Sequence, residues 1–120
     1  MKNIRVLLVE DNEDDVELTL DALGDLGMKE VAVASDGAEA LELLQVLPRP
    51  DLVLLDLRLP MLDGLEVLAR MRIAPDLKSI KVVVLTSSEN PRDVAVCRSL
   101  GVTAYLSKPL NGEELLECLK

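Results

Sequence analysis

The chain has 120 residues, enough for one domain with a proper hydrophobic core and too few for two. Its formal net charge is −9, it has no histidine, and tyrosine is its single aromatic residue. This composition excludes the basic stripe of a nucleic-acid-binding protein and any histidine-based metal or acid–base site. An acidic balance fits a protein that meets a basic surface on a partner or that holds a divalent cation.

No apolar run approaches the length of a membrane span, and Met1–Asn3 lead directly into a strand pattern instead of a signal peptide. We therefore expect a cytoplasmic protein that does not contact a membrane. Cys97 and Cys118 lie in helical patterns without the spacing of metal ligands, so we expect both to be reduced packing residues.

Five short apolar runs alternate with five helical patterns along the chain. The predicted strands cover residues 4–9, 30–34, 52–55, 81–85 and 104–106. The predicted helices run from caps at Asn12 or Asp14 to Gly27, from Asp36 to about Leu47, from Gly64 to before Pro75, from Asn90 to Leu100, and from Asn111 through Leu119. Regular alternation with short connections implies a parallel sheet with helices on both faces, because each crossover is right-handed and returns over the sheet.

Polar residues stand where four of the five predicted strands end. Asp56 follows the third strand, an unbroken apolar run typical of a strand buried on both faces. A carboxylate there is costly to desolvate unless its charge is offset, so Asp56 is a candidate for chemistry. Glu10 and Asp11 follow the first strand, Thr86 the fourth and Lys108 the fifth. Because the carboxyl ends of parallel strands face one crevice where ligands bind, we expect these five side chains to converge.

These positions, together with Pro60, Asp63-Gly64, Ser87, Tyr105 and Pro109, resemble the full signature of a response-regulator receiver domain, the phospho-accepting half of two-component signalling. The resemblance runs from the first strand to the last helix. It implies a doubly wound α/β fold, flavodoxin-like (βα)5, with five parallel strands in the order 2-1-3-4-5. It also implies a single receiver domain over residues 1–120 without an output domain, which either stands alone or was cut from a longer regulator.

In this resemblance Asp56 is the phospho-acceptor and takes its phosphoryl group from a phosphohistidine on a sensor histidine kinase. A carboxylate that attacks phosphorus gives an acyl phosphate, and this step needs charge neutralisation more than proton transfer. Lys108 supplies positive charge on one side, aimed by a Lys108-Pro109 peptide bond that the family holds cis. Mg²⁺ supplies it on the other, bound by Glu10, Asp11, Asp56 and the backbone carbonyl of Arg58. Taken alone, the acids after the first strand are instead typical of a solvated helix start.

The resemblance further implies a two-state surface. Thr86 donates its hydroxyl to the phosphoryl group, and its movement leaves room for Tyr105 to turn inward. The surface that changes is formed by the last two predicted helices and the strand between them, and it would bind a downstream protein or a second copy of the chain. Residues on this surface include Arg92, Val94, Arg98 and Tyr105.

Arg58 and Ser88 occupy the positions that flank the route of attacking water in receivers and that tune phosphate lifetime. The sequence leaves open whether Arg58 shields the acyl phosphate or pairs with an acid. A finer resemblance lies in LLVEDNEDDVELT, PRPDLVLLDLRLP and DGLEVLARM, which are similar to small stand-alone receivers that serve bacterial phytochromes. Those proteins have a Glu-Asp pair and an aspartate in the place of Asp15, so the expected kinase is a bacteriophytochrome.

Three other functions fit the sequence less well. A Mg²⁺-dependent phosphohydrolase with an aspartyl-phosphate intermediate wants a second acid where Arg58 stands. A pseudo-receiver that interacts without phosphorylation usually lacks an acid or the lysine, and none is missing here. A nucleotide-binding flavodoxin-like domain needs a phosphate-cradling loop after its first strand, where residues 12–15 would repel phosphate. Since a receiver does the transfer chemistry on itself, we do not expect a turnover enzyme.

Overall fold

The computed structural model describes residues 4–120, and Met1–Asn3, which the sequence places just before the first strand, lie outside the described residues. Five parallel strands form one sheet in the order β2-β1-β3-β4-β5. The strands are β1 (Arg5–Val9), β2 (Glu30–Ala34), β3 (Leu52–Leu55), β4 (Lys81–Thr86) and β5 (Ala104–Ser107). The helices are α1 (Glu13–Asp25), α2 (Gly37–Leu44), α3 (Gly64–Ile73), α4 (Pro91–Ser99) and α5 (Gly112–Cys118). The predicted architecture and strand order are therefore confirmed.

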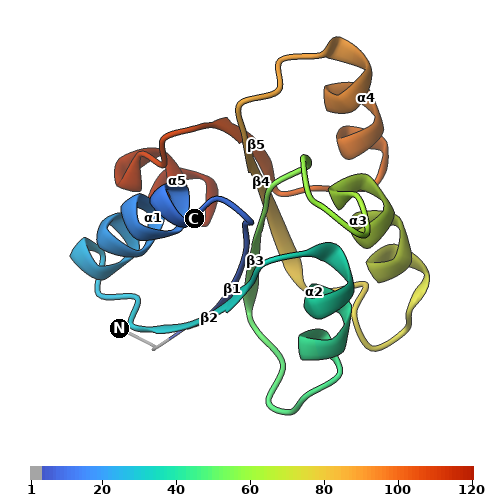
Figure 1. The fold of residues 1–120 in the computed structure, drawn as a ribbon, viewed down its shortest axis with the longest axis horizontal. Helices are drawn as coiled ribbons and strands as arrows, with labels where there is room; N and C mark the ends of the chain where they lie inside the picture. The colour runs from blue at the N-terminus through green and yellow to red at the C-terminus, as the bar shows by residue number, and fades with distance from the viewer. Residues whose placement is uncertain (1–3) are drawn as a thin grey trace.

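The helices form one layer on each face of the sheet. Figure 1 shows α1 and α5 on one face and α2, α3 and α4 on the other. Alternate residues of the central strands pack against the α1–α5 layer: Val6, Leu8, Leu52, Leu54 and Val83. Their neighbours pack against the α2–α3–α4 layer: Leu7, Val9, Val53, Leu55, Val82 and Val84. Because side chains alternate along a strand, β3 is apolar throughout and buried on both faces, as its unbroken apolar run predicts.

Helix α2 is shorter than the sequence predicts. It ends at Leu44 and not near Leu47, and the backbone N–H groups of Gln45 and Val46 donate to carbonyls three residues back, which tightens the last turn. Val46 and Leu47 are exposed, so the apolar pattern continues beyond the last residue that the core accepts. Pro48 also disfavours a helical backbone at Leu47. The other predicted elements begin and end within about two residues of their observed bounds, with Thr86 as the last residue of β4 instead of the residue after it.

The loop after β3 is fixed by the close approach of helix α3. Gly64, the first residue of α3, lies so close to the backbone that an added Cβ would meet the Asp56 carbonyl oxygen and the Cα of Leu57, the latter at 2.7 Å. Its N–H donates to the Leu57 carbonyl at 3.1 Å, and the Asp63 side chain caps the helix. The Asp63-Gly64 pair, part of the signature quoted above, therefore closes the loop that follows Asp56.

Two further observations bear on the sequence analysis. Cys97 is buried, Cys118 is half-buried, and both are free thiols, as expected. Within residues 4–120, no helix combines the length and the apolar character that a membrane span requires.

Candidate functional site

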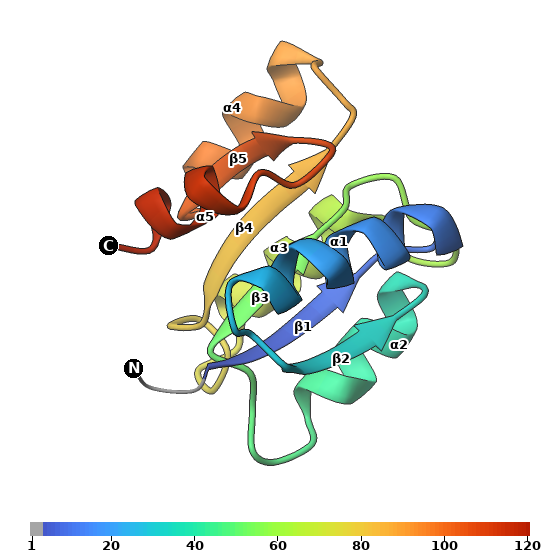
Figure 2. The same cartoon turned by 90° about the vertical axis from the view of Figure 1, so that its left-hand side faces the viewer.

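The five predicted side chains come from one edge of the sheet, and Figure 2 shows the strands running in the same direction toward that edge. Backbone hydrogen bonds extend beyond the strand pairing and hold the chain there. The Glu10 N–H donates to the Ala34 carbonyl at 2.9 Å, and the Asp56 N–H donates to the Val9 carbonyl at 3.1 Å. The Lys108 N–H donates to the Thr86 carbonyl, also at 3.1 Å. The sheet itself therefore sets the spacing between these residues.

The Lys108 ammonium lies among three carboxylates. Its Nζ is 2.5 Å from Glu10 Oε1, 2.8 Å from Asp56 Oδ2 and 2.9 Å from Asp15 Oδ2. The exposed fractions of the Glu10, Asp56 and Lys108 side chains are only 2%, 6% and 14%. Burial alone lowers the pKa of Lys108, but hydrogen bonds to Asp56, Glu10 and Asp15 outweigh it and raise the pKa above 10.5. Lys108 therefore stays charged at neutral pH, and the peptide bond to Pro109 that follows it is cis, as the resemblance implies.

The acids near Lys108 are suited to hold a divalent cation. Glu10, Asp11 and Asp56 each offer a carboxylate oxygen, and these oxygens lie within 4.8 Å of one another. Burial raises the pKa of Glu10, with the repulsion of Asp56 adding to it, although Lys108 and the Asn12 N–H oppose the shift. Hard cations such as Mg²⁺ take oxygen ligands and often retain several waters, and an additional positive charge would relieve this crowding of acids. The donor set therefore fits such an ion.

The backbone of Arg58 lies beside the Asp56 side chain. Its N–H donates to Asp56 Oδ1 at 3.2 Å. Its carbonyl, the predicted fourth ligand, accepts no hydrogen bond within residues 4–120 and so retains its capacity as a ligand. The Arg58 side chain extends toward α4, where Nη2 is 3.5 Å from Ser88 Oγ and 3.9 Å from Asp93 Oδ2.

Thr86 and Tyr105 each form a hydrogen bond with the backbone of Ser88. The buried Thr86 Oγ1 accepts a hydrogen bond from the Ser88 N–H at 3.2 Å. The Tyr105 hydroxyl donates to the Ser88 carbonyl at 2.9 Å, and its ring packs against the core on the α4 side of the sheet. Burial raises the pKa of Tyr105 above 10. The predicted hydroxyl and the predicted aromatic residue are thus joined through a single loop residue.

Two acids contact site residues without having been assigned to the site from the sequence. Asp15, noted only as a feature of phytochrome-associated receivers, binds Lys108 from the first turn of α1. That resemblance was its one signal in the sequence, because the contact with Lys108 depends on how α1 packs against the sheet. Asp93 binds Ser88 Oγ at 2.9 Å and pairs with Arg58 from the first turn of α4. The sequence carries no signal for this contact, which depends on how α4 packs.

Residues 6–120, nearly the whole chain, match the family model described as the response regulator receiver domain. The chain belongs to the response-regulator receiver family. The response regulator Rcp1 of Synechocystis sp. is 42% identical over 122 residues, which cover 96% of this chain and 83% of Rcp1. This receiver is thus similar over nearly its full length to a known response regulator.

Solved structures of phytochrome response regulators have the same fold. The bacteriophytochrome response regulator AtBRR superposes with a TM-score of 0.87 at 42% identity, covering 99% of this chain and 91% of AtBRR. The phosphorylated cyanobacterial phytochrome response regulator RcpA gives a TM-score of 0.84 at 40% identity, covering 99% and 90%. Rcp1 has been solved in a Mn²⁺-bound form, with a TM-score of 0.83 at 42% identity and coverage of 95% and 87%. The resemblance to phytochrome-associated receivers is therefore confirmed.

Proposed function

We propose that this receiver accepts a phosphoryl group from a phosphohistidine of a sensor histidine kinase onto Asp56. The observation that carries the proposal is the setting of Asp56: a buried carboxylate with the Lys108 ammonium at 2.8 Å and the carboxylates of Glu10 and Asp11 beside it. In the transfer, an Asp56 oxygen forms a bond to phosphorus while the bond from phosphorus to the histidine nitrogen breaks. The imidazole keeps the bonding electron pair, and an acyl phosphate forms on Asp56.

This chain's residues would neutralise the charge that arrives. Lys108, already bound to Asp56, can pair with a phosphoryl oxygen as a compact point charge, while Asp15 keeps the ammonium oriented. A Mg²⁺ ion held by Glu10, Asp11, Asp56 and the Arg58 carbonyl would supply the remaining positive charge. The Mn²⁺-bound form of Rcp1 supports a divalent cation in a receiver similar to this one.

Phosphorylation would change the surface formed by α4, β5 and α5. The Thr86 hydroxyl accepts a hydrogen bond from the Ser88 N–H, and the Ser88 carbonyl accepts one from Tyr105, whose ring packs against the core. A turn of Thr86 toward the phosphoryl group would therefore act on the loop residue that holds Tyr105 in this inward position. The changed surface would bind a downstream protein or a second copy of the chain. The similarity to AtBRR and RcpA favours a bacteriophytochrome as the kinase, and the protein would act in the cytoplasm without turning over a substrate.

The test is the uptake of a phosphoryl group from acetyl phosphate or phosphoramidate, followed by intact mass. The wild-type protein should gain the mass of one phosphoryl group when Mg²⁺ is present and lose this ability in EDTA. Asp56→Asn should gain none. Persistent labelling of Asp56→Asn would contradict the assignment of the acceptor, and no uptake by the wild type under any condition would favour a pseudo-receiver that interacts without phosphorylation.

A further inference from the structure

Three interacting side chains connect the loop after β3, beside the phospho-acceptor, to helix α4. Arg58 Nη2 lies 3.5 Å from Ser88 Oγ, Ser88 Oγ donates to Asp93 Oδ2 at 2.9 Å, and Arg58 Nη2 lies 3.9 Å from the same Asp93 oxygen. Asp93 is the more buried of the two charged residues: 18% of its side chain is exposed, compared with 69% of the Arg58 side chain. A carboxylate that is mostly buried needs partners, and Asp93 finds them in these two residues.

Of the two charged residues, Asp93 also has the more fixed position. It lies in the first turn of α4, where the helix dipole favours an acid. Arg58 is a long, mostly exposed side chain on the loop after β3, and such a side chain follows its counter-charge easily. The position of the guanidinium is therefore set by Asp93 and through it by α4.

We propose that Asp93 is a positioning residue for Arg58, and that it sets the lifetime of the phosphoryl group by holding the guanidinium toward α4 and away from Asp56. The inference rests on the proposed phosphorylation of Asp56. It answers the question that the sequence leaves open: Arg58 pairs with an acid, and that acid competes with the phosphoryl group for it.

The competition follows from charge and reach. A phosphoryl group on Asp56 brings between one and two negative charges and three acceptor oxygens. The Arg58 backbone N–H contacts Asp56 Oδ1, so the Arg58 side chain begins beside the acceptor. The guanidinium can thus pair either with Asp93 or with the phosphoryl group. In hydrolysis, a water oxygen bonds to phosphorus, the bond from phosphorus to the Asp56 oxygen breaks, and the carboxylate is restored. The protons of the water pass to the released phosphate and to solvent. Arg58 paired with the phosphoryl oxygens would cover the approach of that water.

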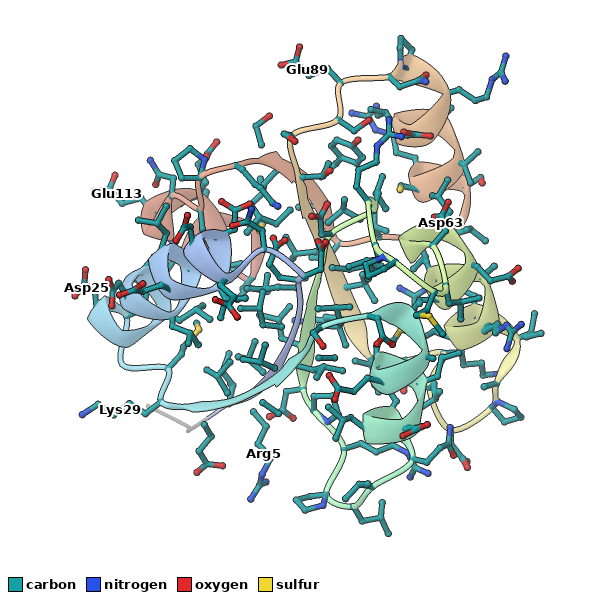
Figure 3. The ribbon with its side chains drawn as sticks, viewed as in Figure 1. Arg5, Asp25, Lys29, Asp63, Glu89 and Glu113 are labelled. Atoms are coloured by element: carbon teal, nitrogen blue, oxygen red, sulfur yellow. The ribbon has the colours of Figure 1, made fainter. Side chains whose placement is uncertain are left out.

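Loss of the Asp93 charge should therefore lengthen the life of the acyl phosphate. We expect Asp93→Asn to slow the loss of the phosphoryl group by about two- to fivefold, which corresponds to the free energy of a partly exposed ion pair. Glu89→Gln is the matched control, because it removes one negative charge from the loop before α4. Within residues 4–120 the Glu89 side chain makes no hydrogen bond or ion pair, and Figure 3 shows it pointing outward from that loop.

The experiment phosphorylates each variant with phosphoramidate and Mg²⁺, removes the donor, and follows the phosphoryl mass with time. The variants are wild type, Asp93→Asn, Glu89→Gln, Arg58→Ala and the double variant Arg58→Ala/Asp93→Asn. Slower decay in Asp93→Asn, unchanged decay in Glu89→Gln, and no further effect of Asp93→Asn when Arg58 is alanine would support the proposal. A purely structural role for Asp93 would instead lower the melting temperature and give the same change with or without Arg58.

Equal or faster decay in Asp93→Asn, or slowing that persists in the Arg58→Ala background, would overturn the inference. Thermal melting shows whether each variant is folded, and Asp93→Ser, which keeps a hydrogen-bonding group in the first turn of α4, replaces Asp93→Asn if the asparagine variant is unfolded. A wild-type protein that takes up no phosphoryl group would refute the proposed function itself, whereas uptake with equal lifetimes refutes only the role of Asp93.

Discussion

Replacement of Lys108 by methionine tests how strongly the acids depend on one ammonium. Methionine keeps most of the volume and removes the charge that contacts Glu10, Asp56 and Asp15. Removing one partner of a buried ion pair costs about 3–5 kcal/mol, because the remaining charge is left without compensation. Glu10, whose pKa burial already raises, can relieve part of this cost by taking a proton. We therefore expect a loss of about 2–4 kcal/mol, which lowers the melting temperature by roughly 10 °C for a chain of this size.

The assay is thermal unfolding in EDTA and again in Mg²⁺. The cation should replace much of the missing positive charge, so Mg²⁺ should raise the melting temperature of Lys108→Met more than that of the wild type. Lys120→Met is the matched control, because within residues 4–120 Lys120 pairs with Glu117 alone and both side chains are about three-quarters exposed, at 74% and 76%. Its melting temperature should change little.

The reasoning would be refuted if Lys108→Met in EDTA were no less stable than Lys120→Met. It would also be refuted if Mg²⁺ raised the melting temperature of Lys108→Met and of the wild type equally. The affinity of the acids for the ion would then not depend on the charge of Lys108.

Three further predictions concern single residues. Tyr105 is the only aromatic residue, so absorbance follows the ionisation of its hydroxyl alone. Because its pKa is raised in the folded protein, the stability that this shift contributes is present below pH 10 and is lost as the pH rises through the raised pKa. A titration midpoint at or below pH 10 would contradict this prediction. Gly64→Ala should cost more than about 2 kcal/mol in thermal unfolding and impair phosphoryl uptake, because its Cβ would meet the backbone of Asp56; wild-type values for both would show that the loop adapts. Asp15→Asn should slow phosphoryl uptake severalfold without abolishing it, since Lys108 keeps two other partners, and an unchanged rate would remove Asp15 from the site.

The sequence was sufficient for the elements and for most of the site. Apolar runs, helix caps and glycines are local signals, so the strands and helices could be placed within about two residues, apart from the end of α2. That helix ends early because burial stops at Leu44, although the apolar pattern continues to Leu47, and burial is a tertiary property. The strand order came from the resemblance, because several orders of five parallel strands satisfy right-handed crossovers equally well.

The predicted convergence of site residues followed from topology alone. Once strands are parallel, the residues after their carboxyl ends must meet, and Glu10, Asp56 and Lys108 do so. The contacts of Asp15 with Lys108 and of Asp93 with Arg58 could not be assigned in the same way. Each joins a helix to a loop or strand end, so it depends on the rotation of the helix against the sheet.

The most direct test of the account is to identify which carboxylate carries the phosphoryl group. After uptake from phosphoramidate in Mg²⁺, reduction of the acyl phosphate with borohydride converts the modified aspartate to homoserine, and peptide mass mapping locates it. The account predicts conversion at Asp56 alone, dependent on the divalent cation. Conversion at Asp11, Asp15 or another acid, with Asp56 unmodified, would contradict it.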